Sequence, residues 1–320
     1  MTDAADSGAR VRLLQIDQVN ETQRIDNFLI SILKGVPKSR IYRMIRSGEV
    51  RVNRGRVKAD YRLKAGDSVR IPPVRVAEPS SQPLSTGLLQ ARLGNRILYE
   101  DADLLAMNKP FGVAVHGGTG LSFGLIEGLR ELRKSEGFFE LVHRLDRDTS
   151  GCLLIAKKRS ALKNLHESFR SERIRKSYTA LLSGILPQKK ITVDRPLRKN
   201  IKKSGEWMAE INSEGKPSRT HFFRTQTYRD ATLVEAFPKT GRTHQIRVHA
   251  ASLGYPILGD ERYGDLEYNK HFRGLGLKRL FLHASSLEFE HPRTGSMIKI
   301  EAPLDEALSG FLQKLAGELR

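Results

Sequence analysis

Residues His143-Arg144-Leu145-Asp146-Arg147-Asp148-Thr149-Ser150-Gly151 form a charged segment in the middle of a chain of 320 residues. Asp146 lies between two arginines, and a nearby positive charge favours the ionised form of a carboxylate. A guanidinium group also holds a carboxylate in a fixed geometry. The segment therefore contains either a structural ion pair or a carboxylate that is kept charged for chemistry.

Apolar runs flank this segment on both sides. Phe138 to Val142 precede it, and Cys152 to Ala156 follow it with the continuous apolar character of a buried strand. The charged residues are thus predicted to lie on a connection between two core segments. Catalytic groups are concentrated on loops that a rigid scaffold holds in place, so this position favours a working carboxylate.

The composition predicts a polyanionic partner. The chain has 55 Lys and Arg against 36 Asp and Glu, which gives a net charge of +19 and a pI near 10.1. Nucleic acid is the first candidate for such a charge. The alternative, a membrane surface, requires a basic amphipathic helix with a Leu-rich or aromatic face, and each such pattern in the sequence is better explained as core.

Length and residue usage set further limits. A chain of this size is expected to form two domains. No stretch reaches the roughly 18 apolar residues of a membrane span, and Met1 to Leu14 lack the apolar centre of a signal peptide. The single cysteine, Cys152, excludes an internal disulfide and lies in an apolar run. We therefore expect a cytoplasmic protein with a buried, inert thiol.

Residues 23–75 form a small basic module, which carries 14 Lys and Arg against 4 Asp and Glu. Apolar residues recur with helical spacing from Ile25 to Leu33. A second helix is predicted from a cap at Ser39 to a stop at Gly48, and short strands follow. Arg40, Arg43 and Arg46 share one face of this helix, and Arg51 comes just after it. These four arginines are predicted to contact phosphates.

The module resembles the S4 RNA-binding domain. The matching residues are Arg24-Ile25-Asp26, Ser39-Arg40, Ile45, Gly48-Glu49-Val50-Arg51-Val52-Asn53 and Gly66-Asp67. The resemblance implies binding of structured RNA, largely through its shape and backbone. Residues 1–22 are expected to be a tail. Proline and serine residues predict an extended linker at 76–95.

Residues 96–320 are predicted to form an α+β domain on a largely antiparallel mixed sheet. Hairpins are predicted at 97–108, 222–237 and 285–301, and helices at 122–132 and 160–169. A second charged cluster, Gly241 to His249, opens a helix that Thr243 can cap. Its histidines, His244 and His249, are five residues apart and miss the i, i+4 spacing of helical zinc ligands, so no metal is expected.

Several motifs of this domain together resemble the pseudouridine synthases of the ribosomal large-subunit type. The matching motifs are Asn108-Lys109-Pro110 with Gly112 and His116, His143 to Gly151, Lys176-x-Tyr178, Gly241 to His249, Leu258-Gly259-Asp260-x-x-Tyr263-Gly264 and Leu282-His283-Ala284. The resemblance spans the whole domain, and it implies the pseudouridine synthase fold. It also implies isomerisation of uridines in 23S rRNA, at more than one site, by a monomer without cofactor or metal.

The resemblance assigns roles to single residues. Asp146 matches the essential aspartate, which acts as nucleophile or as base; the sequence leaves both open. Arg247 matches the arginine partner of that aspartate, and Tyr178 the active-site tyrosine that stacks on the uracil and helps to remove the C5 proton. Arg144 matches a residue that assists base flipping. Arg147 is expected to contact phosphate.

Other functions remain open at this stage. A non-catalytic RNA-binding or ribosome-assembly factor would use the same basic module, but it leaves the set of Asp146, Tyr178 and Arg247 unexplained. A metal-dependent nuclease would need carboxylate and histidine ligands at workable spacing. Within the favoured class, a sister synthase with different target uridines is the main alternative, because target choice depends on RNA shape that the protein sequence does not display.

Overall fold

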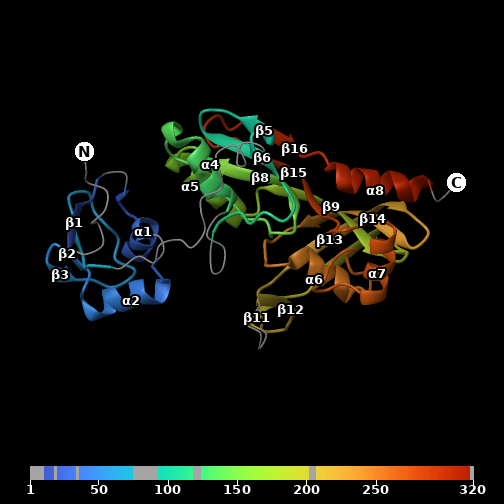
Figure 1. The fold of residues 1–320 in the computed structure, drawn as a ribbon, viewed down its shortest axis with the longest axis horizontal. Helices are drawn as coiled ribbons and strands as arrows, with labels where there is room; N and C mark the ends of the chain where they lie inside the picture. Colours follow the sequence, from blue (N-terminus) through green and yellow to red (C-terminus); the bar gives the residue numbers. More distant parts are fainter. Residues whose placement is uncertain are drawn as a thin grey trace. The chain divides into compact units, whose positions relative to one another are not determined.

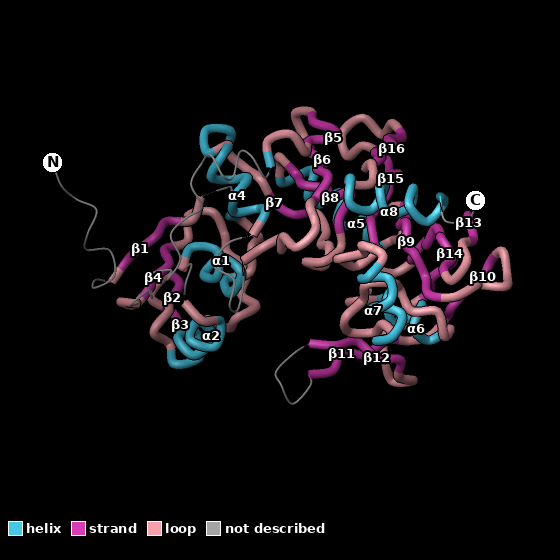
Figure 2. The backbone as a smooth tube through the Cα atoms, turned by 45° about the vertical axis from the view of Figure 1, so that its right-hand side comes forward, coloured by secondary structure: helices cyan, strands magenta, loops and turns pink. Residues whose placement is uncertain are grey.

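The computed structural model describes residues 11–17, 20–33, 36–74, 93–117, 124–201 and 207–317. The chain divides into two compact units, Met1–Gln82 and Pro83–Arg320, which are drawn in Figures 1 and 2. Residues 1–10 of the expected tail and most of the expected linker at 76–95 lie outside the described residues. No helix in the described part of the chain is long and apolar enough to cross a membrane.

The N-terminal unit is a four-stranded sheet with two helices, in the strand order β1-β4-β2-β3. Its elements are β1 (Arg12–Gln15), α1 (Ile25–Ile32), α2 (Lys38–Ser47), β2 (Arg51–Val52), β3 (Gly55–Arg56) and β4 (Ser68–Ile71). One apolar core joins both helices to the sheet, with Leu29, Ile41 and Val69 fully buried. The helix positions follow the apolar spacing of the sequence, because that spacing defines the buried face.

Two details of this unit differ from the sequence prediction. The sheet includes β1, which pairs antiparallel with β4 and lies within the segment expected to be a tail. A four-residue strand has too little periodicity to be recognised before its partner is known. Helix α2 is capped by Pro37 rather than Ser39, without a side-chain hydrogen bond, and it ends at Gly48 with a positive φ of 76° as predicted.

The C-terminal unit is built on a ten-stranded sheet with the order β10-β13-β14-β9-β15-β8-β6-β5, to which β16 and β7 add at β15 and β8. Its strands are β5 (Ile97–Glu100), β6 (Leu104–Lys109), β7 (Glu140–Leu141), β8 (Ser150–Ala156), β9 (Arg175–Ser183), β10 (Lys190–Asp194), β13 (Arg219–Thr227), β14 (Ala231–Pro238), β15 (Leu282–Glu290) and β16 (Met297–Glu301). Among the strands in the described residues, only β8 and β15 pair in parallel, so the predicted α+β class with a largely antiparallel sheet is confirmed.

Helices cover both faces of this sheet (Figure 1). The helices are α4 (Leu125–Leu132), α5 (Arg159–Arg170), α6 (Gln245–Ser252), α7 (Leu266–Gly274) and α8 (Glu306–Gly317). Alternate residues of β6 and β8 pack against α5 on one face and α4 on the other. Near β9 and β14, α6 packs on one face, and α7 and α8 on the opposite face. The period-2 alternation of strand side chains produces this layering.

A small separate hairpin, β11 (Leu197–Ile201) with β12 (Trp207–Ile211), lies beside α6 in Figures 1 and 2. A minor apolar cluster of Leu197, Ala209, Val248 and Tyr263 joins it to that helix. The sequence prediction did not include this hairpin. The three hairpins that it did include are formed, as β5–β6, β13–β14 and β15–β16.

Candidate active site

The charged segment that opened the sequence analysis forms most of the loop between β7 and β8 and, with Ser150 and Gly151, the start of β8. Its backbone is anchored from two sides. The Thr149 N–H donates to the Asp146 carbonyl at 3.1 Å, and the Gly112 N–H donates to the Arg147 carbonyl at 3.0 Å. These bonds place the Asp146 side chain at a fixed point next to the central strand β8.

Lys109 adds a third anchor to the loop. Its side chain is fully buried, and Nζ donates to the carbonyls of Pro110, Val113 and Arg147 at 2.8 to 3.0 Å. Burial lowers the pKa of Lys109 to about 7. Three carbonyl acceptors favour the protonated form, because only an ammonium group donates three hydrogen bonds. This lysine therefore ties the turn after β6 to the loop that carries Asp146.

Asp146 faces a cavity of about 470 Å³. The walls come from four parts of the C-terminal unit: the loop before β8, the end of α5, strand β9 and the segment from Pro238 to Arg247. Of the residues predicted to form the site, Asp146, Tyr178, Arg247 and Arg144 all line this cavity. Its size is within the usual range of small-molecule sites, and a single extruded nucleoside is of that scale.

Arg247 projects from α6 toward the loop, and its Nη1 lies 3.9 Å from Asp146 Oδ2. This is the salt-bridge proximity that the sequence prediction requires. In the described part of the chain, neither Arg144 nor Arg147 forms an ion pair with Asp146. Arg144 is exposed, and Arg147 pairs with Asp148 at 3.2 Å. The structural ion pair with its sequence neighbours, one of the two initial explanations of Asp146, is therefore not formed.

Asp260 is a second acid that binds Arg247, and the sequence analysis gave it no role. Its carboxylate accepts from Arg247 Nε and Nη2, both at 2.7 Å. Burial acts to raise the pKa of Asp260, but hydrogen bonds from Arg247 and from the N–H groups of Arg262 and Tyr263 outweigh it and lower that pKa. The pair thus holds a charged guanidinium in a buried position beside Asp146.

Tyr178 lies on β9, where it pairs with Ala236 of β14 on one side and Ala284 of β15 on the other. Both neighbours have small side chains, and the Tyr178 ring forms part of the cavity wall. Burial, and then the charge of Asp146, raise the pKa of Tyr178, so its phenol is neutral. A neutral ring at this position fits the stacking role that the resemblance implies.

His244 lines the cavity and bonds to Tyr263, and the sequence analysis assigned neither of them a role. The predicted cap of α6 was Thr243, but the residue before the helix is His244, in the left-handed conformation with φ of 53°. His244 Nδ1 lies 2.8 Å from the Tyr263 hydroxyl, and Nε2 lies 3.8 Å from Asp146 Oδ2. The matched motif Leu258 to Gly264 contains both Asp260 and Tyr263, and it was the one sequence signal for them.

Arg147 lines a neighbouring cavity of about 380 Å³ instead of the Asp146 cavity. Arg247 lines both cavities. The two arginines that flank Asp146 in sequence therefore face different spaces. Arg144 and Arg147 face different cavities because the chain turns between them.

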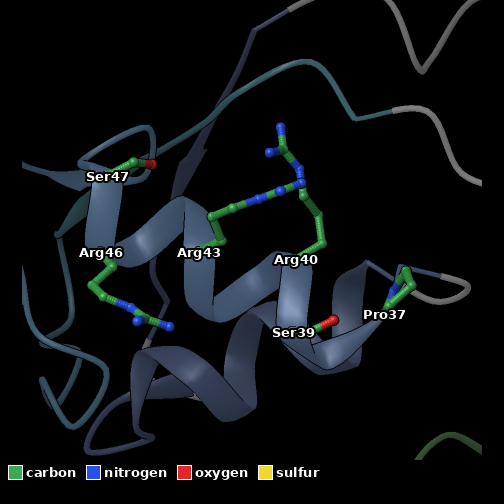
Figure 3. Close-up of a pocket in the computed structure, with 6 residues that line it drawn as sticks. All are labelled: Pro37, Ser39, Arg40, Arg43, Arg46 and Ser47. Carbon is green, nitrogen blue, oxygen red and sulfur yellow. The ribbon is translucent and has the colours of Figure 1, made fainter.

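The predicted phosphate-binding arginines lie on the N-terminal unit, where a surface hollow of about 700 Å³ is lined by Pro37, Ser39, Arg40, Arg43, Arg46 and Ser47. Figure 3 shows Arg40, Arg43 and Arg46 projecting from α2. Arg40 pairs with Glu49 at 3.1 Å. Among the described residues, no acid pairs with Arg43 or Arg46. Arg51 is exposed on β2 and donates to the Gly48 carbonyl.

The described residues contain one cluster whose donors are close enough for a metal ion, namely Asp101, Asp103 and His291. Asp103 already pairs with Lys158 at 2.9 Å and Arg293 at 2.6 Å, and His291 bonds to Asp101. Two cationic side chains thus already pair with one carboxylate of this cluster. His249, considered earlier as a ligand, has both ring nitrogens engaged with Thr220 and Arg195.

Comparison with known proteins bears directly on this site. The profile of the RNA pseudouridylate synthase family matches residues 103–252, and the S4 domain profile matches residues 23–69. The "Ribosomal large subunit pseudouridine synthase C" of Escherichia coli K12 is 56% identical over 308 residues, which cover 95% of this chain and 97% of that protein. The protein of the same name from Haemophilus influenzae is 54% identical and covers 95% of each chain.

Solved structures agree with these sequence matches. Human RNA Pseudouridylate Synthase Domain Containing 4 has a TM-score of 0.61 at 25% identity, over 72% of this chain and 96% of that one. Human RNA Pseudouridylate Synthase Domain Containing 1 has a TM-score of 0.58 at 27% identity, over 75% and 98%. With an aspartate, a tyrosine and an arginine around one cavity, the chain belongs to the RNA pseudouridylate synthase family, whose members isomerise uridine in RNA, and it carries an N-terminal S4 domain.

Proposed function

We propose that this enzyme converts uridines of 23S rRNA in the large ribosomal subunit to pseudouridine, at more than one position, with Asp146 as the essential carboxylate. The observation that carries the proposal is the single cavity that Asp146, Arg247 and Tyr178 line together, with Arg247 3.9 Å from Asp146. The names of the bacterial relatives support the large-subunit substrate. The net charge of +19 fits a polyanionic partner of this kind.

The reaction breaks the C1′–N1 bond, turns the uracil and joins its C5 to C1′; C5 loses a proton and N1 gains one. Asp146 serves this reaction as nucleophile at the sugar or as base at the ribose, and either role needs an ionised carboxylate. Arg247 stabilises that charge from 3.9 Å. Tyr178 stacks on the uracil and assists removal of the C5 proton.

The remaining arginines handle the RNA. Arg144, exposed at the cavity rim, fills the space that the flipped uridine leaves, a step that costs a few kcal/mol of unstacking. Arg147 and the S4 arginines Arg40, Arg43, Arg46 and Arg51 contact phosphates. We infer a domain order of tail 1–22, S4 domain 23–75, linker 76–95 and catalytic domain 96–320. The enzyme acts as a monomer in the cytoplasm, where ribosomal RNA is its substrate.

The test is the variant Asp146→Asn, with Asp148→Asn as its matched control. Asp148 belongs to the same loop but lines the neighbouring cavity. We expect Asp146→Asn to bind rRNA as the wild type does and to form no pseudouridine, while Asp148→Asn keeps the modification. Carbodiimide-based primer extension on 23S rRNA from a deletion strain that expresses each variant measures this. A normal modification signal from Asp146→Asn would overturn the assignment.

A further inference from the structure

His244 lies where two parts of the active site meet. Its side chain is 9% exposed and lines the Asp146 cavity. One ring nitrogen faces the Tyr263 hydroxyl at 2.8 Å, and the other faces the Asp146 carboxylate at 3.8 Å. The ring is therefore a link between a residue of the motif after α6 and the catalytic carboxylate.

The hydrogen bonds of Tyr263 decide which nitrogen of His244 carries the proton. The Ala209 N–H of β12 donates to the Tyr263 oxygen at 2.8 Å. Among the described residues, His244 Nδ1 is the acceptor available to the Tyr263 hydroxyl proton. Since Nδ1 then accepts, the neutral ring carries its hydrogen on Nε2. That N–H points into the cavity, toward Asp146.

Burial is the main reason that the His244 ring is neutral. Burial lowers the pKa of His244; Arg247 and Arg262 act in the same direction, whereas Asp146 and Asp260 oppose it. A neutral imidazole with a fixed tautomer is a hydrogen-bond donor of constant strength at neutral pH. It does not need to gain or lose a proton to act on the carboxylate.

The two donors beside Asp146 approach the same oxygen. Arg247 Nη1 lies 3.9 Å and His244 Nε2 lies 3.8 Å from Oδ2. No donor among the described residues is within hydrogen-bond distance of Oδ1. A shift of the carboxylate by about 1 Å would bring Oδ2 into hydrogen-bond range of both donors.

We propose that His244 is a positioning residue, whose neutral Nε2–H together with Arg247 holds Oδ2 of Asp146 and leaves Oδ1 to react with the ribose. The proposal rests on the proposed catalytic role of Asp146 and adds an orientation to it. Loss of the His244 donor would leave Arg247 as the one group on Oδ2 among the described residues, and rotation of the carboxylate about its Cβ–Cγ bond would be less restricted. Misplacement of a reacting group on this scale reduces turnover by about 10- to 100-fold.

Two substitutions test the roles of the two ring nitrogens of His244 separately. In His244→Asn, the amide lies near the position of Nδ1, so it keeps the link to Tyr263 but does not reach Asp146. Asparagine also tolerates the left-handed backbone found here, at φ of 53°, which favours folding. In His244→Gln, the amide nitrogen reaches the position of Nε2 and can donate to Asp146. Neither amide can act as an acid or a base near neutral pH.

Steady-state kinetics on a 23S rRNA fragment test the proposal. We expect His244→Asn to lower kcat by about 10- to 100-fold with little change in KM, and His244→Gln to restore kcat to within a few-fold of the wild type. Equal and large losses in both variants would mean that the imidazole itself transfers a proton or only supports the fold, and would overturn the proposal. Wild-type kcat in His244→Asn, or a change confined to KM, would also overturn it.

NMR of ¹⁵N-histidine-labelled enzyme gives a second, independent readout. We expect the His244 resonances, assigned by their absence in His244→Gln, to report a protonated Nε2 and an unprotonated Nδ1 at pH 7. The opposite tautomer would overturn the proposal. Failure of the inference is distinguishable from failure of the proposed function, because the latter would appear as pseudouridine formation by Asp146→Asn.

Discussion

Arg247 is bound at two points by Asp260 and reaches Asp146 with its remaining nitrogen. The two bonds to Asp260 are 2.7 Å long, whereas the contact with Asp146 is 3.9 Å. Both Arg247 and Asp260 are almost completely buried, and the Asp146 side chain is 24% exposed. The buried acid therefore fixes the cation, and the cation in turn lies beside a carboxylate that is accessible from the cavity.

The first prediction concerns Asp260. Asp260→Asn leaves the Arg247 charge buried with a weaker partner, and breaking a buried pair costs about 3 to 5 kcal/mol of folding free energy. We also expect kcat to fall by about 10-fold or more, because Arg247 is no longer held beside Asp146. Chemical denaturation and kinetics measure both effects. Glu261→Gln is the control, since Glu261 is 80% exposed and pairs with Arg273 on the surface. A similar free energy of unfolding and a similar kcat in Asp260→Asn and Glu261→Gln would contradict this account.

The second prediction concerns the hydroxyl of Tyr178. Tyr178→Phe keeps the ring that stacks on the base but removes the group expected to help take the C5 proton. We expect RNA affinity to change less than about twofold and the modification rate to fall by about 100-fold or more. Single-turnover assays on rRNA fragments and filter binding measure the two quantities. A wild-type rate in Tyr178→Phe would limit Tyr178 to stacking.

The third prediction concerns the parallel pairing of β8 with β15. Gly151 has φ of 111°, and a Cβ there would clash with the Ala284 carbonyl oxygen. We expect Gly151→Ala to lower the free energy of unfolding by about 3 kcal/mol or more, through backbone strain and the clash. Gly274→Ala is the control, because a Cβ at Gly274 meets nothing within 4 Å. Urea denaturation compares them, and equal stability would contradict the predicted clash.

The fourth prediction concerns pH and His143. Its ring stacks on Phe169, and Nε2 accepts from the Leu154 N–H, so protonation breaks that bond. Burial lowers the pKa of His143 to about 3. Because the unfolded state binds the proton near pH 6.5, this residue contributes stability above that pH and loses it as the pH falls from about 6.5 toward 3.

We expect His143→Gln, which keeps an acceptor for the Leu154 N–H but does not titrate, to show a weaker decrease of stability in acid. The difference in slope is at most about 1.4 kcal/mol per pH unit. Denaturation curves of both proteins from pH 7 to pH 4 measure it. Parallel slopes would show that His143 is not kept neutral by the fold.

The fifth prediction concerns the S4 domain. Arg43→Ala combined with Arg46→Ala removes two cations that have no acid partner among the described residues. If both contact phosphates, the slope of log K against log salt should flatten by about 1.5 units and affinity should fall. Arg62→Ala is the control, because Arg62 bonds to the Thr22 carbonyl and is not part of the hollow on α2. An unchanged slope in the double variant would remove these arginines from the RNA contact.

Much of the fold could be predicted from local patterns. Helices α1, α2 and α5 and the three predicted hairpins follow the apolar spacing and the turn residues of short segments. Elements whose stability comes from distant partners could not be predicted in this way. Strand β1 depends on pairing with β4, and the hairpin β11–β12 depends on its contact with α6. A short segment has no such information within itself.

The sequence by itself determined that Asp146 lies on a loop between core strands, that a basic module precedes it, and which family motifs surround it. These properties follow from neighbouring residues and from charge. Only the tertiary structure decided that Asp260 holds Arg247, that His244 rather than Thr243 precedes α6, and that Tyr263 reaches His244. The physical reason is that α6 packs on β13 and β14, while the loop that carries Asp146 is anchored beside β8. These contacts therefore join segments that are far apart in the sequence, and the number of residues between two segments does not tell how close they lie in the fold.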